Sequence, residues 1–405
     1  MAALALVVCL GGLPGCGGGP TATPSQTTPE RVKAPTSPYL NTEPGVAYVG
    51  DAKCVSCHSE IGKSFAMHPM GRSATLPADV KPDVQGKVIE ADGLVYSIER
   101  RDGRVFHKSA PKVGDPNASG KPSVEAEVRY VIGSGTRGYS FLVEKGNGLY
   151  QSPIAWYTEE KRWDLAPGYH ERNLQFDRPI TTGCLFCHVN QIEPIEGKPP
   201  VIHGLTIGCE RCHGPGELHV KAAQAVPLVD KNGKPEKGKD RTIVNPADLE
   251  PTLREAVCEQ CHFQGTQRLP LPGKTEADYR PGLPLDLFML VMNSRFDPAQ
   301  RGRAVGQVDE MRLSRCFRES GGKLGCTSCH DPHKLPEVSE KIAYYRERCL
   351  ECHENKGCRL PSAERLKKSP ADDCALCHMP RYPSGNIAHA SQTNHSIPRI
   401  PRPMR

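Results

Sequence analysis

A five-residue motif, C-x-x-C-H, occurs seven times in this chain and constrains its fold more than any other feature. The two cysteines of such a motif form thioethers with the vinyl groups of a c-type haem, and the histidine binds the iron as proximal ligand. A single C-x-x-C pair is also typical of a zinc site or a redox dithiol, but neither needs a histidine directly after the second cysteine. Seven copies therefore predict seven covalently bound c-type haems. Numbered 1 to 7 along the chain, the motifs occupy residues 54–58, 184–188, 209–213, 258–262, 326–330, 349–353 and 374–378.

The motifs assign fourteen thioether cysteines and seven proximal histidines. The cysteines are Cys54, Cys57, Cys184, Cys187, Cys209, Cys212, Cys258, Cys261, Cys326, Cys329, Cys349, Cys352, Cys374 and Cys377. The proximal histidines are His58, His188, His213, His262, His330, His353 and His378. Haem c is attached after export, so we expect a periplasmic or cell-surface protein.

Eight further histidines are candidates for distal iron ligands. His333 follows His330 by three residues, which span at most about 10 Å. Because His330 already occupies the near face of its own haem, we expect His333 to bind the iron of a neighbouring haem. His219, six residues after His213, has a similar position. The predicted distal ligands are His68, His203, His219, His333, His389 and His395, with Met67 and Met70 as alternatives to His68.

The two remaining histidines are weaker candidates. His170, which follows a Pro-Gly-Tyr sequence before motif 2, is a weak candidate, and we expect His107 to be a surface residue. Met311 is more typical of a packing residue than of an iron ligand. The ligand count bears on function, because a haem with two histidine ligands only transfers electrons, whereas a five-coordinate haem can bind a small substrate.

The composition indicates a chain with little regular core of its own. Its 39 glycines and 38 prolines make up about a fifth of the 405 residues, compared with about 12% in average proteins, and only 6% of residues are aromatic. Haems would supply the missing apolar mass. We therefore predict a multihaem cytochrome fold of mostly short α-helices and loops around a haem stack, with a β-rich insert.

The formal charge of +6 does not indicate a nucleic-acid partner. A ferric bis-histidine haem with both propionates ionised carries about −1, so seven haems add about −7 and leave the holoprotein close to neutral. The expected partners are other redox proteins.

The chain divides into five predicted segments. Residues 1–16 form an apolar signal peptide that ends in a lipobox-like sequence, in which Cys16 would be acylated and tether the protein to a membrane; the alternative is a plain secretory signal peptide. Residues 17–45 are rich in Gly, Pro, Thr and Ser and form a flexible tether. Residues 46–84 contain haem 1, residues 85–160 form the β-rich insert, and residues 161–405 form a multihaem domain with haems 2 to 7.

The insert and the later segments carry recognisable secondary-structure patterns. Asp92-Gly93, Asp102-Gly103 and the sequence around Asn147 are typical hairpin turns. The strands we expect span residues 87–90, 94–99, 105–108, 124–132, 139–144 and 149–157. The helices we expect span residues 253–263, 305–315, 341–353 and 362–368.

Four cysteines lie outside the motifs. Cys316 and Cys358 flank motifs 5 and 6, and export permits a disulfide, so we predict that they pair. The alternative is two free buried thiols. The other two, Cys9 and Cys16, belong to the signal segment.

Three stretches resemble the multihaem cytochromes related to the nitrifiers' tetrahaem cytochrome c and to hydroxylamine oxidoreductase: residues 209–219, 326–333 and 374–381. The resemblance extends over about half of the chain, from Cys184 onward. It implies closely packed haems in parallel-stacked and near-perpendicular pairs, mainly bis-histidine iron, and electron transfer as the default role. The β-rich insert departs from this pattern. All seven motifs end in His, which argues against the related nitrite reductases that use C-x-x-C-K.

We therefore expect a membrane-tethered heptahaem c-type cytochrome that carries electrons between redox partners by haem-to-haem transfer. The alternative is a haem enzyme for nitrite, hydroxylamine, nitric oxide or a sulfur oxyanion at one haem with an open axial position. A third hypothesis is a subunit of a larger assembly that docks through the insert. No catalytic residue is predicted.

Overall fold

The structure is a computed structural model that describes residues 37–80, 86–193, 195, 198–225, 240–292, 304–353 and 358–400. The predicted signal peptide, Cys9, Cys16 and residues 17–36 of the predicted tether lie outside the described residues. One compact unit comprises Thr36–Arg405. Across the described ranges, we find no helix with the length and apolar character needed to cross a membrane.

The six predicted strands are all present, and two of their connections have the predicted turns. Strand β3 (Leu94–Arg101) buries Leu94, Tyr96 and Ile98, every second residue, against the core. Asp92-Gly93 and Asp102-Gly103, the turns before and after β3, have positive φ at both residues. This is the type I′ geometry that two-residue hairpins favour.

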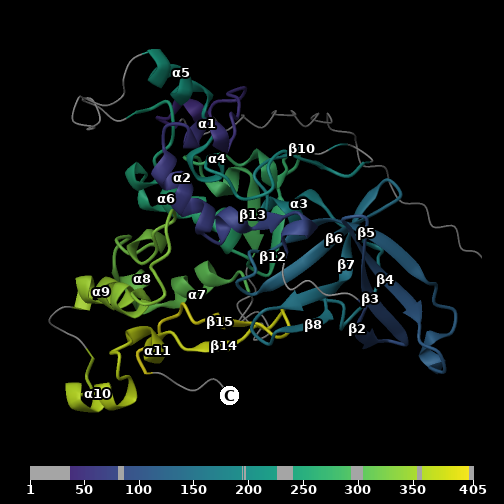
Figure 1. Cartoon of the computed structure of the whole chain (residues 1–405). Helices are drawn as coiled ribbons and strands as arrows, with labels where there is room; N and C mark the ends of the chain where they lie inside the picture. Colours follow the sequence, from purple (N-terminus) through teal and green to yellow (C-terminus); the bar gives the residue numbers. More distant parts are fainter. Residues whose placement is uncertain are drawn as a thin grey trace, which may run out of the picture. The chain divides into compact units, whose positions relative to one another are not determined.

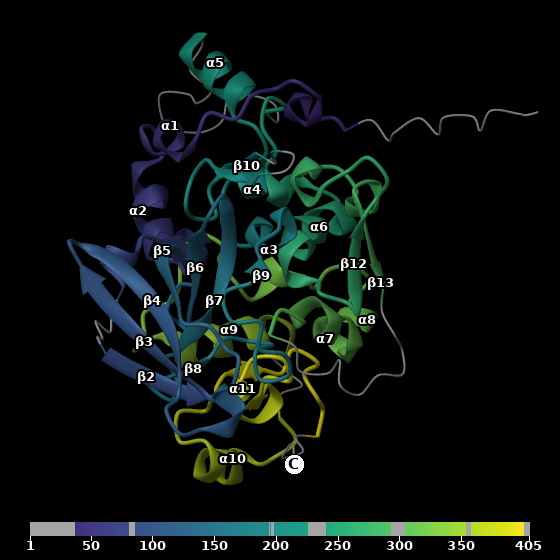
Figure 2. The same ribbon diagram turned by 90° about the vertical axis from the view of Figure 1, so that its right-hand side faces the viewer.

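These strands belong to a nine-stranded antiparallel sheet with the order β2-β3-β4-β5-β6-β7-β8, in which β1 pairs with β5 and β9 with β7 (Figure 1). The sheet curls, and its end strands β2 and β8 approach each other (Figure 2). The strands are β1 (Ala74–Thr75), β2 (Gly86–Ala91), β3, β4 (Arg104–Pro111), β5 (Val124–Ile132), β6 (Gly138–Lys145), β7 (Gly148–Tyr157), β8 (Arg162–Leu165) and β9 (Arg178–Pro179).

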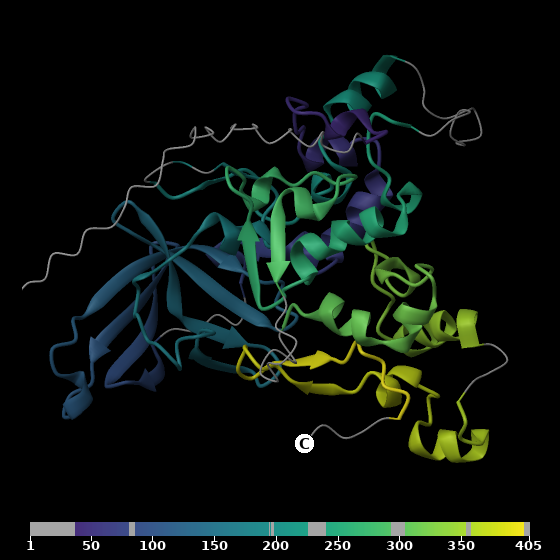
Figure 3. The ribbon, with the colours of Figure 1, turned by 180° about the vertical axis from the view of Figure 1, so that it is seen from behind.

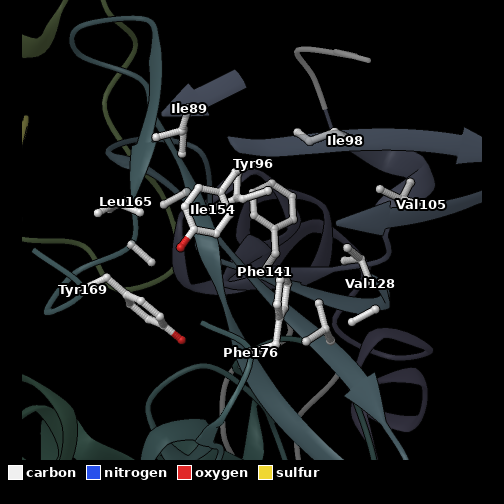
Figure 4. Packing of buried hydrophobic residues seen from close by; sticks show 14 of the residues in the cluster. Ile89, Tyr96, Ile98, Val105, Val128, Phe141, Ile154, Leu165, Tyr169 and Phe176 are labelled. Carbon is white, nitrogen blue, oxygen red and sulfur yellow. The ribbon is translucent and has the colours of Figure 1, made fainter. Parts of the chain in front are cut away.

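The curled sheet encloses the largest apolar cluster of the described residues. Tyr96, Ile154, Phe141 and Phe176 gather between the strands (Figure 4), each at most 3% exposed. Burying side chains of this size contributes about 1.5–3 kcal/mol each. The sheet therefore has a core of its own that needs no cofactor.

The predicted fold class is consequently wrong in its main statement. The largest regular structure is the sheet, and it includes β1, β8 and β9 from outside residues 85–160. The low aromatic content and high Gly and Pro content describe the chain on average, whereas its alternating apolar residues are concentrated in one stretch. His107 corrects a second expectation, because it is fully buried in this sheet and not on the surface.

Eleven α-helices occur in the described residues, most of them short. All four predicted helices are present, as α6, α7, α9 and α10. The helices are α1 (Asp51–Val55), α2 (Ser59–Met67), α3 (Thr182–Phe186), α4 (Glu210–His213), α5 (Glu217–Ala225), α6 (Pro251–His262), α7 (Gln307–Leu313), α8 (Arg315–Glu319), α9 (Lys341–His353), α10 (Ser362–Lys368) and α11 (Cys374–His378).

Three small strand pairs connect the helical segments (Figure 3). They are β10 (Ile192–Glu193) with β11 (Val201–Ile202), β12 (Gln267–Pro270) with β13 (Met289–Met292), and β14 (Arg381–Pro383) with β15 (Ser391–Thr393). The sheet also packs directly on motif 2, because Leu142 and Leu149 share an apolar cluster with Leu185 and Val189.

Candidate haem centre

Each C-x-x-C-H motif lies on a helical turn or at the end of a helix. Motifs 1 to 4, 6 and 7 involve α1, α3, α4, α6, α9 and α11, and motif 5 forms the 3-10 helix η9 (Cys326–Ser328). The N–H of His58 donates to the Cys54 carbonyl (2.8 Å) and that of His330 to the Cys326 carbonyl (3.0 Å). With about 3.6 residues per turn, both cysteines and the histidine of a motif share one face, as attachment of one haem requires.

Carboxylates that the sequence analysis missed fix the motifs relative to one another. Glu210, inside motif 3, is 1% exposed and accepts hydrogen bonds from the backbone N–H groups of Val49, Gly50 and Gly216 (2.8–2.9 Å). Asp51 accepts from the Cys209 amide (2.9 Å). No local sequence signal identifies Glu210 and Asp51 as such acceptors, because Val49, Gly50 and Cys209, whose amides they bind, lie in distant parts of the chain.

Glu255 plays the same role between motifs 4 and 5. It lies on α6, is 6% exposed, and accepts a hydrogen bond from the Cys326 amide (3.0 Å). Arg254 donates to its other oxygen (3.2 Å). The start of motif 5 is thus held against the helix that carries motif 4.

Thiols of different motifs lie near one another in a continuous series. The pairs Cys54–Cys209, Cys187–Cys261, Cys258–Cys326 and Cys349–Cys374 are close enough for each thiol to shift the pKa of its neighbour, which places motif 1 near 3, 2 near 4, 4 near 5 and 6 near 7. Cys212 lies within electrostatic range of Cys258, and Cys329 of Cys352, which connects motif 3 to 4 and 5 to 6. The order of neighbouring motifs is therefore 1-3-4-5-6-7, with motif 2 next to motif 4.

Three proximal histidines face a second histidine ring in the described part of the chain. His58 faces His219 with ring centres 6.4 Å apart and planes at 20°. His330 faces His395 at 6.3 Å and 32°. His213 faces His333 at 6.0 Å and 11°, so His333 lies opposite motif 3 and not opposite its neighbour His330.

These distances fit an iron between each pair of rings. A metal lies about 2 Å from an imidazole nitrogen, and the ring centre about 1 Å further, so the ring centres of two trans ligands are about 6 Å apart. Among the described residues no three His, Cys, Asp or Glu side chains converge on a metal-ion site. Six of the histidines instead form three ring pairs, as expected where a porphyrin supplies the other four ligands.

Hydrogen bonds at Nδ1 leave Nε2 free at several of these rings. A carbonyl oxygen only accepts, so a ring nitrogen bonded to it must donate, and the other nitrogen keeps its lone pair. The Nδ1 partners are the Val244 carbonyl for His213 (2.8 Å), the Thr393 carbonyl for His395 (2.9 Å) and the Pro398 carbonyl for His378 (3.0 Å). Asp240 pairs with His219 (2.7 Å) and Gln307 with His262 (3.3 Å).

Burial keeps several of these imidazoles neutral. Desolvation lowers the pKa of His213, His262 and His395 below the ordinary value of about 6.5. A neutral imidazole is the form that binds a metal. Helices α2, α5, α9, α10 and α11 also contain no fully buried residue, so each leaves a face that can pack against a haem.

The predicted ligands His203 and His389, and the weaker candidate His170, have different surroundings. His203 Nε2 pairs with Glu193 (2.8 Å), and both ring nitrogens of His389 pair with carboxylates, Glu160 and Asp164 (2.7 Å each). His170 is half exposed near Asp164. These three histidines form no ring pair with a proximal histidine in the portion of the chain that the structure covers.

His68 has the opposite ring arrangement to His213. Its Nδ1 accepts a hydrogen bond from the Met70 amide (3.2 Å), so the proton of the neutral ring lies on Nε2. Burial lowers its pKa, and His333 and His262 lie near it. The buried His107 uses Nδ1 for Ser152 (2.8 Å) inside the sheet and is no haem ligand.

The remaining predictions on cysteine and methionine have clear outcomes. Cys316 and Cys358 are both free, so the predicted disulfide is wrong. Cys316 instead lies within electrostatic range of Cys329 and Cys349. Met311 is buried on α7 and acts as a packing residue, as expected.

The comparisons with known proteins concern the fold. Neither a family model nor a curated protein sequence matches the chain. The crystal structure of the outer cell wall cytochrome OcwA aligns with a TM-score of 0.51 and 17% identity, over 86% of this chain and 79% of that one. An undecahaem cytochrome from the S-layer of Carboxydothermus ferrireducens aligns at 16% identity over 83% of this chain, which spans only 51% of the other, and its TM-score of 0.39 carries no argument. The chain therefore shares its fold with an outer cell wall cytochrome.

Proposed function

We propose that this chain is an exported multihaem c-type cytochrome with seven covalent haems, which carries electrons between redox partners. The observation that carries the proposal is the close succession of the seven motifs, whose thiols neighbour one another in the order 1-3-4-5-6-7, with motif 2 next to motif 4. Each bound haem supplies one-electron redox chemistry. The polypeptide brings the attachment points together, orients the axial ligands and limits water access.

In this proposal His219, His333 and His395 are the distal ligands of motifs 1, 3 and 5. The ring-pair distances of 6.0–6.4 Å support these assignments. The hydrogen bonds from Nδ1 to Asp240 and to the Thr393 carbonyl support two of them further. His68 stays a predicted ligand without an assigned site, because its Nδ1 accepts a hydrogen bond from the Met70 amide.

Localisation and kinship are part of the same proposal. Haem c attachment and the likeness to an outer cell wall cytochrome support export, and the sequence of residues 13–16 supports a lipid anchor on Cys16. The sequences at 209–219, 326–333 and 374–381 support kinship with the nitrifier tetrahaem cytochrome and hydroxylamine oxidoreductase group.

A second candidate function, redox catalysis at an open haem, has one specific observation in its favour. All fifteen histidines are in the described ranges, yet only three proximal rings face another histidine ring there. Carboxylates pair with His203, His170 and His389, and the sheet buries His107. Among the histidines, His68 alone therefore remains for the sites of motifs 2, 4, 6 and 7.

The test is a haem count combined with spin-state spectroscopy on protein matured with haem c. Intact-mass analysis should show seven haems, and reduced protein should pass electrons to an acceptor protein. A lower haem count, or haems that do not exchange electrons with one another, contradicts the proposal. A high-spin fraction that binds carbon monoxide would favour the catalytic alternative over a pure carrier.

A further inference from the structure

Residues 374–398, near the end of the described chain, link two haem sites to the sheet. This segment begins with motif 7 on α11, continues through the β14–β15 hairpin, and then presents His395 to His330 of motif 5. Its Pro398 carbonyl accepts the Nδ1 hydrogen bond of His378 (3.0 Å). Contacts that hold this hairpin in place therefore also hold the His395 ring opposite motif 5.

Glu159, in the turn between β7 and β8, forms the first attachment. Its carboxylate accepts hydrogen bonds from the backbone N–H of Ser391 (2.9 Å) and from the Ser391 hydroxyl (2.8 Å). It also pairs with Arg381 on the other strand of the hairpin (3.0 Å). One carboxylate of the sheet therefore holds both β14 and β15, which lie beside β8 in Figure 1.

His389, at the tip of the hairpin, forms the second attachment. Its Nδ1 bonds to Glu160 and its Nε2 to Asp164, both at 2.7 Å, and its ring packs edge-on against Tyr157 with centres 5.0 Å apart. His389 has φ of 53°, a conformation that costs a non-glycine residue energy unless its contacts compensate. The His389 ring, predicted from the sequence to be an iron ligand, is instead held by these contacts.

Apolar contacts add a third attachment, because Ile387 and Ala388 pack against the core cluster of the sheet. Beyond the hairpin, the Asn394 amide donates to the Pro380 carbonyl (3.1 Å), and the His395 amide donates to Glu310 (2.7 Å). His395 is thus connected through one short peptide to both the sheet and α7.

We propose that Glu159, Glu160 and Asp164 of the sheet are positioning residues for an axial ligand. They anchor the C-terminal hairpin through Ser391, Arg381 and His389, and so hold His395 opposite His330. This inference rests on the proposed function, and it gives the sheet a role: the sheet sets the coordination of motif 5. Loss of the anchor makes the hairpin mobile and opens that iron.

The test compares holoprotein variants at the anchor with a matched control. His389→Ala removes the tip contacts, Glu159→Gln weakens the strand contacts with minimal change of shape, and Glu159→Asp tests rescue. Glu125→Gln removes a carboxylate from the same sheet that pairs with Arg101 and Lys108, so it is the control. Haem content, spin state and hydrogen exchange of residues 384–396 are measured on each.

For His389→Ala and Glu159→Gln we expect seven haems, hydrogen exchange of the hairpin faster by on the order of tenfold, and one haem in seven converted to high spin. His395→Ala should give the same spectrum, and Glu159→Asp and Glu125→Gln should resemble wild type. Faster exchange with an unchanged spectrum, or unchanged exchange, overturns the inference. If wild-type protein itself holds fewer haems or has no low-spin signal at motif 5, the proposed function fails instead.

Discussion

Replacing His333 by alanine should open one haem site and leave the others intact. His333 faces His213 with nearly parallel rings, at 11° and 6.0 Å, the most regular of the three ring pairs. The backbone N–H of residue 333 donates to Asp331 (2.8 Å), and alanine keeps that hydrogen bond, so the loop after motif 5 should hold its conformation. The change therefore removes the ring without removing its support.

The expected size of the effect follows from the count of motifs. One of seven haems loses its sixth ligand, so about 14% of the total iron should become high-spin and bind carbon monoxide when reduced. His219→Ala acts on motif 1, so the double variant should give two haems in seven. The two effects should add because the ring pairs belong to different motifs.

Magnetic circular dichroism and electron paramagnetic resonance measure these fractions directly. The matched control is His203→Ala, because His203 is half exposed and bonded to Glu193. A His333→Ala protein whose high-spin fraction equals that of wild type would refute the reasoning. An increase in the His203→Ala protein would show that the ring pairs do not identify the ligands.

Three further outcomes follow from the structure. Glu210→Ala should lower the free energy of unfolding, measured with denaturant, by about 3 kcal/mol or more, because three amides lose a buried carboxylate. The control is the exposed Glu60→Ala, which should change it by under about 0.5 kcal/mol. Burial lowers the pKa of His107 to about 3, so its contribution to stability is present above pH 6.5 and lost as pH falls toward 3. Against His107→Gln, wild type should lose about 1.4 kcal/mol more per pH unit between pH 6 and 4; equal slopes would contradict this. Alkylation of residues 36–405, unfolded without a reductant, should modify two thiols, Cys316 and Cys358. If neither thiol is modified, the two cysteines form the disulfide after all.

The sequence was most informative where chemistry requires a fixed local pattern. The seven motifs place two thiols and one imidazole on a single helical turn, so attachment could be predicted from spacing alone. The hairpin strands could be predicted as well, because Asp92-Gly93 and Asp102-Gly103 take the positive φ values that type I′ turns require. Both patterns extend over a few residues and do not depend on distant parts of the chain.

Distal histidines could not be assigned from sequence because their surroundings come from remote segments. His219 and His389 look equally suitable as ligands in the sequence. The structure places one ring opposite His58 and the other between Glu160 and Asp164. His107 was misjudged for the same reason: a polar residue on a strand is buried when its neighbours across the sheet, here Ser152, offer a hydrogen bond.

The fold class was misjudged because average composition hides local concentration. The glycines and prolines lie largely in turns and loops, while alternating apolar residues from β2 to β8 build a complete core. The sheet also contacts the haem region in two places. It packs on motif 2 through Leu185 and Val189, and it holds the C-terminal hairpin through Glu159.

A crystal structure of the haem-loaded protein, with iron–ligand distances, tests the central claim most directly. We expect seven irons, with neighbouring sites in the order 1-3-4-5-6-7 and motif 2 beside motif 4. Nε2 of His219, His333 and His395 should lie about 2 Å from the irons of motifs 1, 3 and 5. Fewer than seven irons, a break in that order, or any of these three histidines away from every iron would contradict the claim.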